Sequence, residues 1–144
     1  MKEDIDKLFN AGIELRDNGQ LTQSVQGFLE IIQKYPNYSK LGGTYTVLAG
    51  IYFDLEDFNS SLTYFSKATQ LKPKSELASL GLYLSYVKLN NYEMAINELK
   101  RYLDEYPAKL YKDTLEELLG DMNNGYALKY KDVIQRLADK NGVE

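Results

Sequence analysis

The residues that could carry chemistry in this 144-residue chain are its carboxylates, because it contains no histidine and no cysteine. Without these two types it has no thiol nucleophile, no thiolate metal ligand and no histidine to activate a serine. Acidic side chains alone could still act as general acids and bases or bind a hard cation. Most familiar hydrolase chemistry is therefore unavailable, and clusters of Asp and Glu are the first candidates for catalysis or metal binding.

Three short clusters of acids occur along the chain. They are Asp4 with Asp6, Asp54 with Glu56 and Asp57, and Glu116 with Glu117. Each falls at a helix end or on an exposed-looking helix face, and acids near a helix start are favoured by the helix dipole without any other role. Gly42 and Gly43 do not form a phosphate-binding loop, since no strand precedes them and no lysine and threonine pair follows. We therefore predict a non-enzymatic protein with no catalytic, cofactor-binding or metal-binding residues.

The overall composition limits which partners and which cellular compartment we expect. A hydrophobic content of 44% and a charged content of 26% are typical of a soluble globular protein, and the length predicts one domain over 1–144. The net charge of −4 has both signs scattered along the chain, so we expect no nucleic-acid partner. No apolar run is long enough to span a membrane, and MKEDIDKLFN lacks the pattern of a signal peptide. We expect a cytoplasmic protein with no membrane association.

The prolines mark a repeat. Pro36, Pro73 and Pro107 each follow an amphipathic helical pattern, in LEIIQKYP, SKATQLKP and KRYLDEYP. A proline stops a helix because it cannot donate to the helical ladder and because it disfavours the helical conformation of the preceding residue. The two intervals between the prolines are nearly equal, and their length is typical of stacked helical hairpins.

Reading backwards from each proline gives the same layout three times. A second helix ends at the proline, a polar turn precedes that helix, and a first helix precedes the turn. The turns are RDNGQ, LEDFN and KLNNY. The first helices are predicted over 3–17, 41–55 and 76–89, and the second helices over 21–35, 58–72 and 92–106.

The side chains at fixed positions in these hairpins resemble the tetratricopeptide repeat, a unit of about 34 residues. The second repeat matches best, with Tyr45, Leu48, Ala49, Tyr52, Ser61, Phe65 and Pro73. The first has Leu8, Ala11, Gly12, Leu15, Ser24, Phe28 and Pro36, and the third has Ser79, Leu82, Tyr83, Tyr86, Ala95, Leu99 and Pro107. Tyr83 departs from the pattern, because the family has a small residue there.

The resemblance implies an all-α fold, an α-solenoid of three helical hairpins with two further C-terminal helices. We place the repeats at about 5–38, 42–75 and 76–109. The C-terminal helices, at about 109–122 and 126–140, lack the repeat pattern and are expected to cap the last exposed face of the stack.

Each first helix has a second line of residues, spaced i, i+4, i+7, that the packing pattern does not use. By resemblance to the family, this line faces the concave side of the stack, where a peptide or helix of a partner protein commonly binds. We call these residues the first-helix stripe: Phe9, Ile13, Arg16, Thr46, Gly50, Phe53, Leu80, Leu84 and Val87.

The sequence also bears on which kind of ligand would bind in the groove and on whether the groove is open. Family members that bind acidic chaperone tails use lysine, asparagine and arginine at concave positions. The corresponding residues here are Phe9, Ile13, Val47, Leu77 and Gly81, which favours an apolar helix instead. Leu128, Val133, Ile134 and Leu137 share one face of the last helix, so that helix could also fill the groove. An open groove and a partly plugged one stay alternatives.

Thirteen tyrosines are many for this length. Those at repeat positions, Tyr45, Tyr52, Tyr86 and Tyr102, are expected to fill space between helices. Others lie at or beyond repeat ends, and some of these could form a recognition surface: Tyr38, Tyr106, Tyr111, Tyr126 and Tyr130.

Three hypotheses for function follow. The first is a cytoplasmic adaptor or scaffold that binds another protein through the concave face. The second is a client-specific chaperone or an immunity protein for a secreted effector or toxin, which rests on similar architecture alone. The third is a symmetric homodimer formed through the exposed ends of the stack.

The interval from Pro36 to Pro73 is longer by three than the interval from Pro73 to Pro107, and the extra residues fall in KYPNYSKLGG. We therefore predict that the first hairpin is stacked at an altered angle or offset. Tyr38 and Leu41 should pack in the widened junction.

Overall fold

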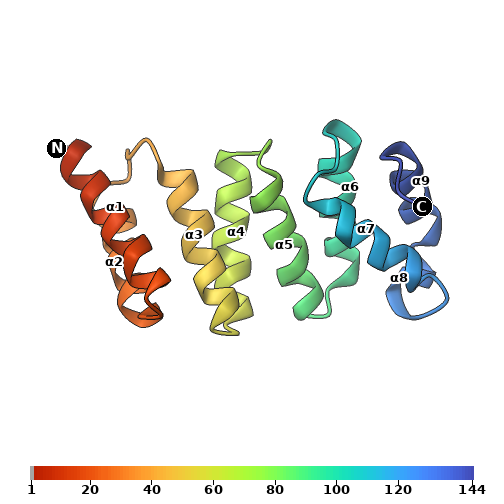
Figure 1. The fold of residues 1–144 in the computed structure, drawn as a ribbon, viewed down its shortest axis with the longest axis horizontal. Coiled ribbons are helices and arrows are strands. Elements are labelled where there is room, and N and C mark those ends of the chain that lie inside the picture. Colours follow the sequence, from red (N-terminus) through yellow and green to blue (C-terminus); the bar gives the residue numbers. More distant parts are fainter. Residues whose placement is uncertain (1) are drawn as a thin grey trace. The chain divides into compact units, whose positions relative to one another are not determined.

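The computed structural model describes residues 2–144, with side chains from residue 4 onward, and within that range it is all-α, as predicted. The helices are α1 (Lys2–Asp17), α2 (Leu21–Lys34), α3 (Leu41–Asp54), α4 (Phe58–Leu71), α5 (Glu76–Lys88), α6 (Tyr92–Glu105), α7 (Tyr111–Gly120), α8 (Gly125–Lys129) and α9 (Lys131–Lys140). The chain divides into two compact units, Met1–Lys72 and Pro73–Glu144. The first contains the hairpins α1–α2 and α3–α4, and the second contains α5–α6 and the C-terminal helices (Figure 1).

The three prolines end three helices in the same way. The second helix of each hairpin ends two residues before its proline, and the residue between them leaves the helical conformation. That residue has φ −130° and ψ 64° at Tyr35, φ −132° and ψ 70° at Lys72, and φ −132° and ψ 151° at Tyr106. This is the restriction that a proline imposes on its predecessor. The stops predicted from the sequence are confirmed.

The turn inside each hairpin also repeats. Gly19, Glu56 and Asn90 have φ of 80°, 61° and 60°, and their spacing along the chain is the same as that of the three prolines. The next residue's N–H bonds to a carbonyl five residues earlier in every case, as in Gln20 to Leu15 at 2.8 Å. This pattern is a Schellman helix end. Only the first turn supplies the glycine that a positive φ favours.

The core of the first unit forms where α1 and α2 approach closely. Gly12 is buried in α1, and the Ser24 hydroxyl of α2 donates to the Gly12 carbonyl at 2.7 Å. The Phe28 ring, which is fully buried, lies against Gly12 and contacts Phe9 edge-on at 5.5 Å. Ile31, Leu48 and Ile51 continue this apolar cluster across α2 and α3. A small residue at position 12 is therefore required by the packing of the hairpin.

The core of the second unit joins α5 and α6 to the C-terminal helices. Its buried side chains include Tyr83, Leu99, Tyr111, Leu115 and Leu137. The carboxylate of Glu76 accepts hydrogen bonds from the backbone N–H groups of Lys109 and Tyr111, at 2.8 and 2.9 Å. These bonds fix the start of α7 against the start of α5. α9 packs chiefly against α7 and also contacts α6 and α8.

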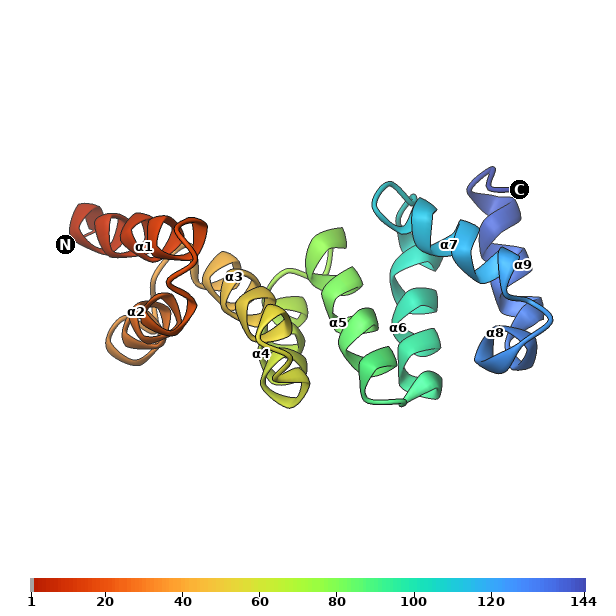
Figure 2. The same ribbon diagram turned by 60° about the horizontal axis from the view of Figure 1, so that its bottom comes forward.

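One helical prediction is wrong, because the single helix expected over 126–140 is two helices, α8 and α9 (Figure 2). They meet at Tyr130, whose φ of −107° and ψ of 23° depart from helical values. The two helices satisfy different contacts. Tyr126 of α8 pairs its hydroxyl with that of Tyr83, whereas Ile134 and Leu137 of α9 are fully buried in the core. The chain bends at Tyr130 so that both sets of contacts form.

Candidate functional site

The first-helix stripe in α1 faces partly inward. Phe9 and Ile13 are half-buried and pack against the core of the first unit. Arg16 is also half-buried, and its guanidinium pairs with Asp17 at 2.9 Å. The apolar members of this segment therefore already have contacts within their own unit, and part of each side chain stays accessible.

The stripe in α3 lies outside the apolar core cluster of the first unit. Thr46, Gly50 and Phe53 are half-buried and follow one another along one face of the helix. The Thr46 hydroxyl donates to the Gly42 carbonyl at 2.9 Å, and the Phe53 ring contacts Phe58 edge-on at 5.1 Å. A Cβ built on Gly50 would meet no described atom within 4 Å. Gly50 thus leaves a gap between a small polar side chain and an aromatic one.

The glycines of the first unit differ in how they are packed. A Cβ at Gly12 would lie 2.7 Å from Phe28 Cζ, and one at Gly42 would lie 3.0 Å from Lys72 Cδ. At Gly27 and Gly50, both inside helices, such an atom would meet no described atom within 4 Å. Gly12 is explained by helix packing. Helix packing does not explain Gly50, although a glycine inside a helix lowers the stability of the protein.

The stripe in α5 belongs to the second unit. Leu80, Leu84 and Val87 are half-buried, and they pack against the cluster that also contains Ile134 and Leu137 of α9. These three residues therefore contribute to the core of their unit. The choice between an open and a plugged groove stays a prediction.

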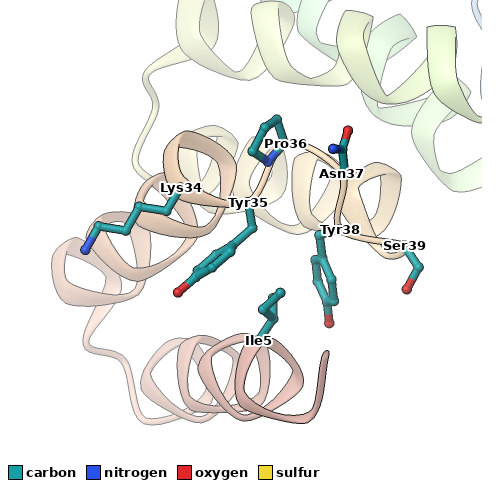
Figure 3. A pocket seen from close by; sticks show the side chains of 7 residues that line it. All are labelled: Ile5, Lys34, Tyr35, Pro36, Asn37, Tyr38 and Ser39. Atoms are coloured by element: carbon teal, nitrogen blue, oxygen red, sulfur yellow. The ribbon is translucent and has the colours of Figure 1, made fainter. Parts of the chain in front are cut away.

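A pocket of about 420 Å³ lies at the α2–α3 junction of the first unit. It is lined by Ile5, Lys34, Tyr35, Pro36, Asn37, Tyr38 and Ser39. The rings of Tyr35 and Tyr38 both point toward α1, and Ile5 extends between them (Figure 3). A second pocket, of about 300 Å³, shares the residues from Pro36 to Ser39 and adds Leu41, Gly42, Leu71 and Lys72. The loop from Pro36 to Ser39 therefore has a pocket on either side.

Tyr38 connects this loop to α1. Its side chain is buried, and its hydroxyl donates a hydrogen bond to the carboxylate of Asp6. The ammonium of Lys40 lies 3.6 Å from the same carboxylate. Burial, together with the hydrogen bond to Asp6, raises the pKa of Tyr38 to about 12. The predicted packing of Tyr38 in the junction is confirmed by its burial, while the packing of the half-buried Leu41 and the altered stacking angle stay predictions.

A buried polar cluster in the second unit was not predicted from the sequence. Glu98 of α6 is only 7% exposed, and it accepts a hydrogen bond from Ser79 at 2.6 Å and two from Arg101, at 2.8 and 2.6 Å. The Ser79 hydroxyl also bonds to that of Tyr111 at 2.8 Å. Burial raises the pKa of Tyr111, so this phenol stays protonated. Each of these polar groups has a hydrogen-bond partner inside the cluster, which suits a structural role. The one sign of this burial in the sequence was that Glu98 lies between the apolar residues Ile96 and Leu99.

Two of the five tyrosines considered for a recognition surface are buried. Tyr38 is 6% exposed and Tyr111 is fully buried, because each fills a core cluster. Tyr106, Tyr126 and Tyr130 are half-buried.

Among the described residues, no group of three or more His, Cys, Asp or Glu side chains could hold a metal ion. No helix in the described range has both the length and the apolar character needed to cross a membrane.

The periodic hairpins, their proline stops and their small-residue contacts define a helical-repeat protein. Residues 43–75 match the tetratricopeptide repeat model, which confirms the predicted resemblance. Over 89 residues the chain is also 30% identical to Protein EBS1 of Eremothecium gossypii. That alignment covers 61% of this chain and 12% of EBS1, so the chain spans only a small part of that relative.

Proposed function

We propose that this chain is a non-enzymatic protein–protein interaction module, an adaptor that binds a peptide or helix of a partner protein along the first-helix stripe. A tetratricopeptide repeat suggests an interaction module, and the match at residues 43–75 covers most of α3. The α3 residues of the stripe, Thr46, Gly50 and Phe53, are therefore the best-supported part of this binding surface. The same role is proposed for Phe9, Ile13 and Arg16 in the first unit and, separately, for Leu80, Leu84 and Val87 in the second unit.

The observation that carries the proposal is the gap at Gly50, which lies in the first-helix stripe, unlike the equally open Gly27 of α2. A glycine inside a helix is less favourable than alanine by about 1 kcal/mol. The first unit would accept a larger residue there, since a Cβ on Gly50 meets no described atom within 4 Å. A partner backbone that packs closely against α3 would explain the glycine, because a side chain at position 50 would keep the partner away from the helix.

The neighbours of Gly50 indicate what would bind. Phe53 offers an aromatic edge and Thr46 a small, partly apolar side chain, one turn of helix to either side. Arg16 is the only basic residue of the stripe. An apolar helix laid into such a surface would use contacts spaced by three and four residues. An acidic peptide would find few cations here.

The test compares two matched glycine substitutions. Gly50→Leu places a side chain in the stripe, and Gly27→Leu places the same side chain in a similarly open position inside α2. Both variants should gain helix stability, by up to about 1 kcal/mol. Proteins recovered by affinity capture from the native cell, identified by mass spectrometry, should be lost with Gly50→Leu and kept with Gly27→Leu.

Equal recovery by the two variants, with circular dichroism showing an intact fold, would contradict the proposed binding face. A cytoplasmic location and a symmetric dimer stay predictions. Cell fractionation tests the first, and light scattering at several protein concentrations tests the second.

A further inference from the structure

A pocket of about 510 Å³ lies in the second unit, between the α5–α6 turn and α8. Both segments are found at the same end of α6 in Figures 1 and 2. The pocket is lined by Asn90, Asn91, Tyr92, Glu93, Gly125, Tyr126, Lys129 and Tyr130. None of these residues belongs to the first-helix stripe, so the pocket is a separate surface.

The aromatic wall of this pocket is held in place from several directions. The rings of Tyr92 and Tyr126 are stacked, with centroids 4.4 Å apart and planes 9° apart. The Tyr126 hydroxyl is hydrogen-bonded to that of Tyr83 at 2.9 Å, and the Tyr92 hydroxyl donates to Asn90 Oδ1 at 2.9 Å. All three pocket tyrosines are half-buried and so keep part of their surface accessible. The wall is therefore ordered before any ligand arrives, which lowers the entropic cost of binding.

The polar side of the pocket offers hydrogen-bond donors. Asn90 uses its carbonyl oxygen to accept from Tyr92, and Asn91 uses its own to accept from Met94 N at 3.3 Å. Within the described residues the side-chain NH₂ groups of Asn90 and Asn91 make no hydrogen bond, and both residues are exposed. A ligand for this surface would present flat apolar groups to the rings and carbonyl oxygens to the amides.

We propose that the pocket binds a proline-rich segment of another protein in the polyproline II conformation. Such a segment makes no hydrogen bonds within itself, so its carbonyls are available to Asn90 and Asn91. Its prolines have no N–H to be left without an acceptor, and their rings pack on tyrosine faces. Glu93 and Lys129, at the edge of the pocket, add one charge of each sign for residues that flank the prolines.

Two other ligands fit less well. A methylated or free ammonium ion would meet the positive charge of Lys129, whose ammonium lies 5.3 Å from the centre of the Tyr130 ring. A nucleic acid strand would need a basic groove, whereas this pocket carries one lysine against one glutamate and the chain has a net charge of −4.

The experiment titrates the ¹⁵N-labelled full chain with a ten-residue proline peptide, and separately with a glycine–serine peptide of the same length. Only the proline peptide should shift amide resonances, and the shifts should concentrate at 90–93 and 125–130. Asn90→Gly removes the donor and also the acceptor of the Tyr92 hydroxyl, and it keeps the turn, because Asn90 already has a φ of 60°. It should weaken binding about fivefold, the equivalent of one net hydrogen bond.

Glu56→Gly is the matched control, since Glu56 has the equivalent position and a φ of 61° in the second hairpin. This variant should bind the proline peptide like the wild type, and Tyr130→Leu should bind it more weakly. Equal shifts with the glycine–serine peptide, shifts centred elsewhere, or wild-type affinity in both Asn90→Gly and Tyr130→Leu would overturn the proposal. Tighter binding of a trimethyllysine peptide than of the proline peptide would overturn it as well.

Discussion

The ring of Phe28 occupies the space that a side chain at Gly12 would need, with Phe28 Cζ 2.7 Å from the position of a Cβ. Phe28 is fully buried and has Phe9 against its edge. The ring therefore cannot move aside without disturbing the rest of the first core. This single contact sets how closely α1 and α2 approach.

Gly12→Ala should destabilise the protein by about 1–3 kcal/mol, the usual range for overpacking a dense core. Urea unfolding of the variant and the wild type measures the difference. The cost should fall in a Phe28→Leu background, because the smaller side chain makes room for the new methyl group. Gly27→Ala, at an open helical position, should instead raise the stability. If Gly12→Ala lowers the stability equally in both backgrounds, the contact with Phe28 is not the cause of the loss.

Glu56→Gly should stabilise the protein by about 1 kcal/mol, because Glu56 has a φ of 61°, a conformation that strains every residue with a Cβ and costs glycine little. Gly19→Ala makes the opposite change in the first hairpin, where φ is 80°, and should destabilise it by a similar amount. Thermal unfolding of both variants checks the pair. A lower melting temperature for Glu56→Gly would show that its side chain makes a contribution greater than the backbone strain.

Tyr38 should make the stability fall at alkaline pH. Its pKa is raised to about 12 in the fold and is about 10 in an unfolded chain, so the fold favours the protonated phenol. The contribution is complete below pH 10 and is lost as the pH rises from 10 to 12. Tyr38→Phe should therefore be less stable than the wild type at pH 7, and the gap should narrow above pH 10. Urea unfolding at several pH values measures it; a gap that does not change with pH would contradict the role of Tyr38 ionisation.

Glu98→Ala should cost about 2–4 kcal/mol, because it removes a buried acceptor from Ser79 and Arg101. The value is below that of a fully buried ion pair, since the Arg101 side chain is 39% exposed. Glu98→Gln keeps the shape and an acceptor and should cost less. Chemical unfolding of the two variants gives the comparison.

The control for this pair is Glu30 with Lys34 on α2, whose side chains are 47% and 59% exposed and 2.8 Å apart. Glu30→Ala should change the stability by less than about 1 kcal/mol, as expected for a surface ion pair. Similar losses from Glu30→Ala and Glu98→Ala would contradict the importance of burial.

The sequence was sufficient for the hairpins because their ends depend on local chemistry. Pro36, Pro73 and Pro107 restrict their own predecessors, and Asp57 and Asn91 cap the helices that they precede. Gly12 and Ser24, which meet at a close helix contact, were likewise among the residues that carry the tetratricopeptide resemblance. These effects act over a few residues or follow a fixed period, so a pattern in the sequence records them.

Features that depend on distant contacts were missed. The bend at Tyr130 interrupts a stretch with a good helical pattern, because Tyr126 bonds to Tyr83 while Ile134 packs in the core. The burial of Glu98 depends on partners that α5 and α7 supply. For the site, the periodic spacing predicted which residues line one helix face. It could not reveal that Gly50 has open space beside it, or that the α5–α6 turn and α8 enclose a pocket.

The three hairpin turns place a glycine, a glutamate and an asparagine in one backbone conformation. What repeats along this chain is thus a set of torsion angles, and the residue that adopts them is free to differ. Mutations could replace the characteristic residues of a repeat one at a time and leave the spacing of its helices unchanged. Each replacement at such a position would lower the folding stability by about 1 kcal/mol. Divergent copies of this hairpin would then be easier to recognise from where the chain turns than from which amino acids turn it.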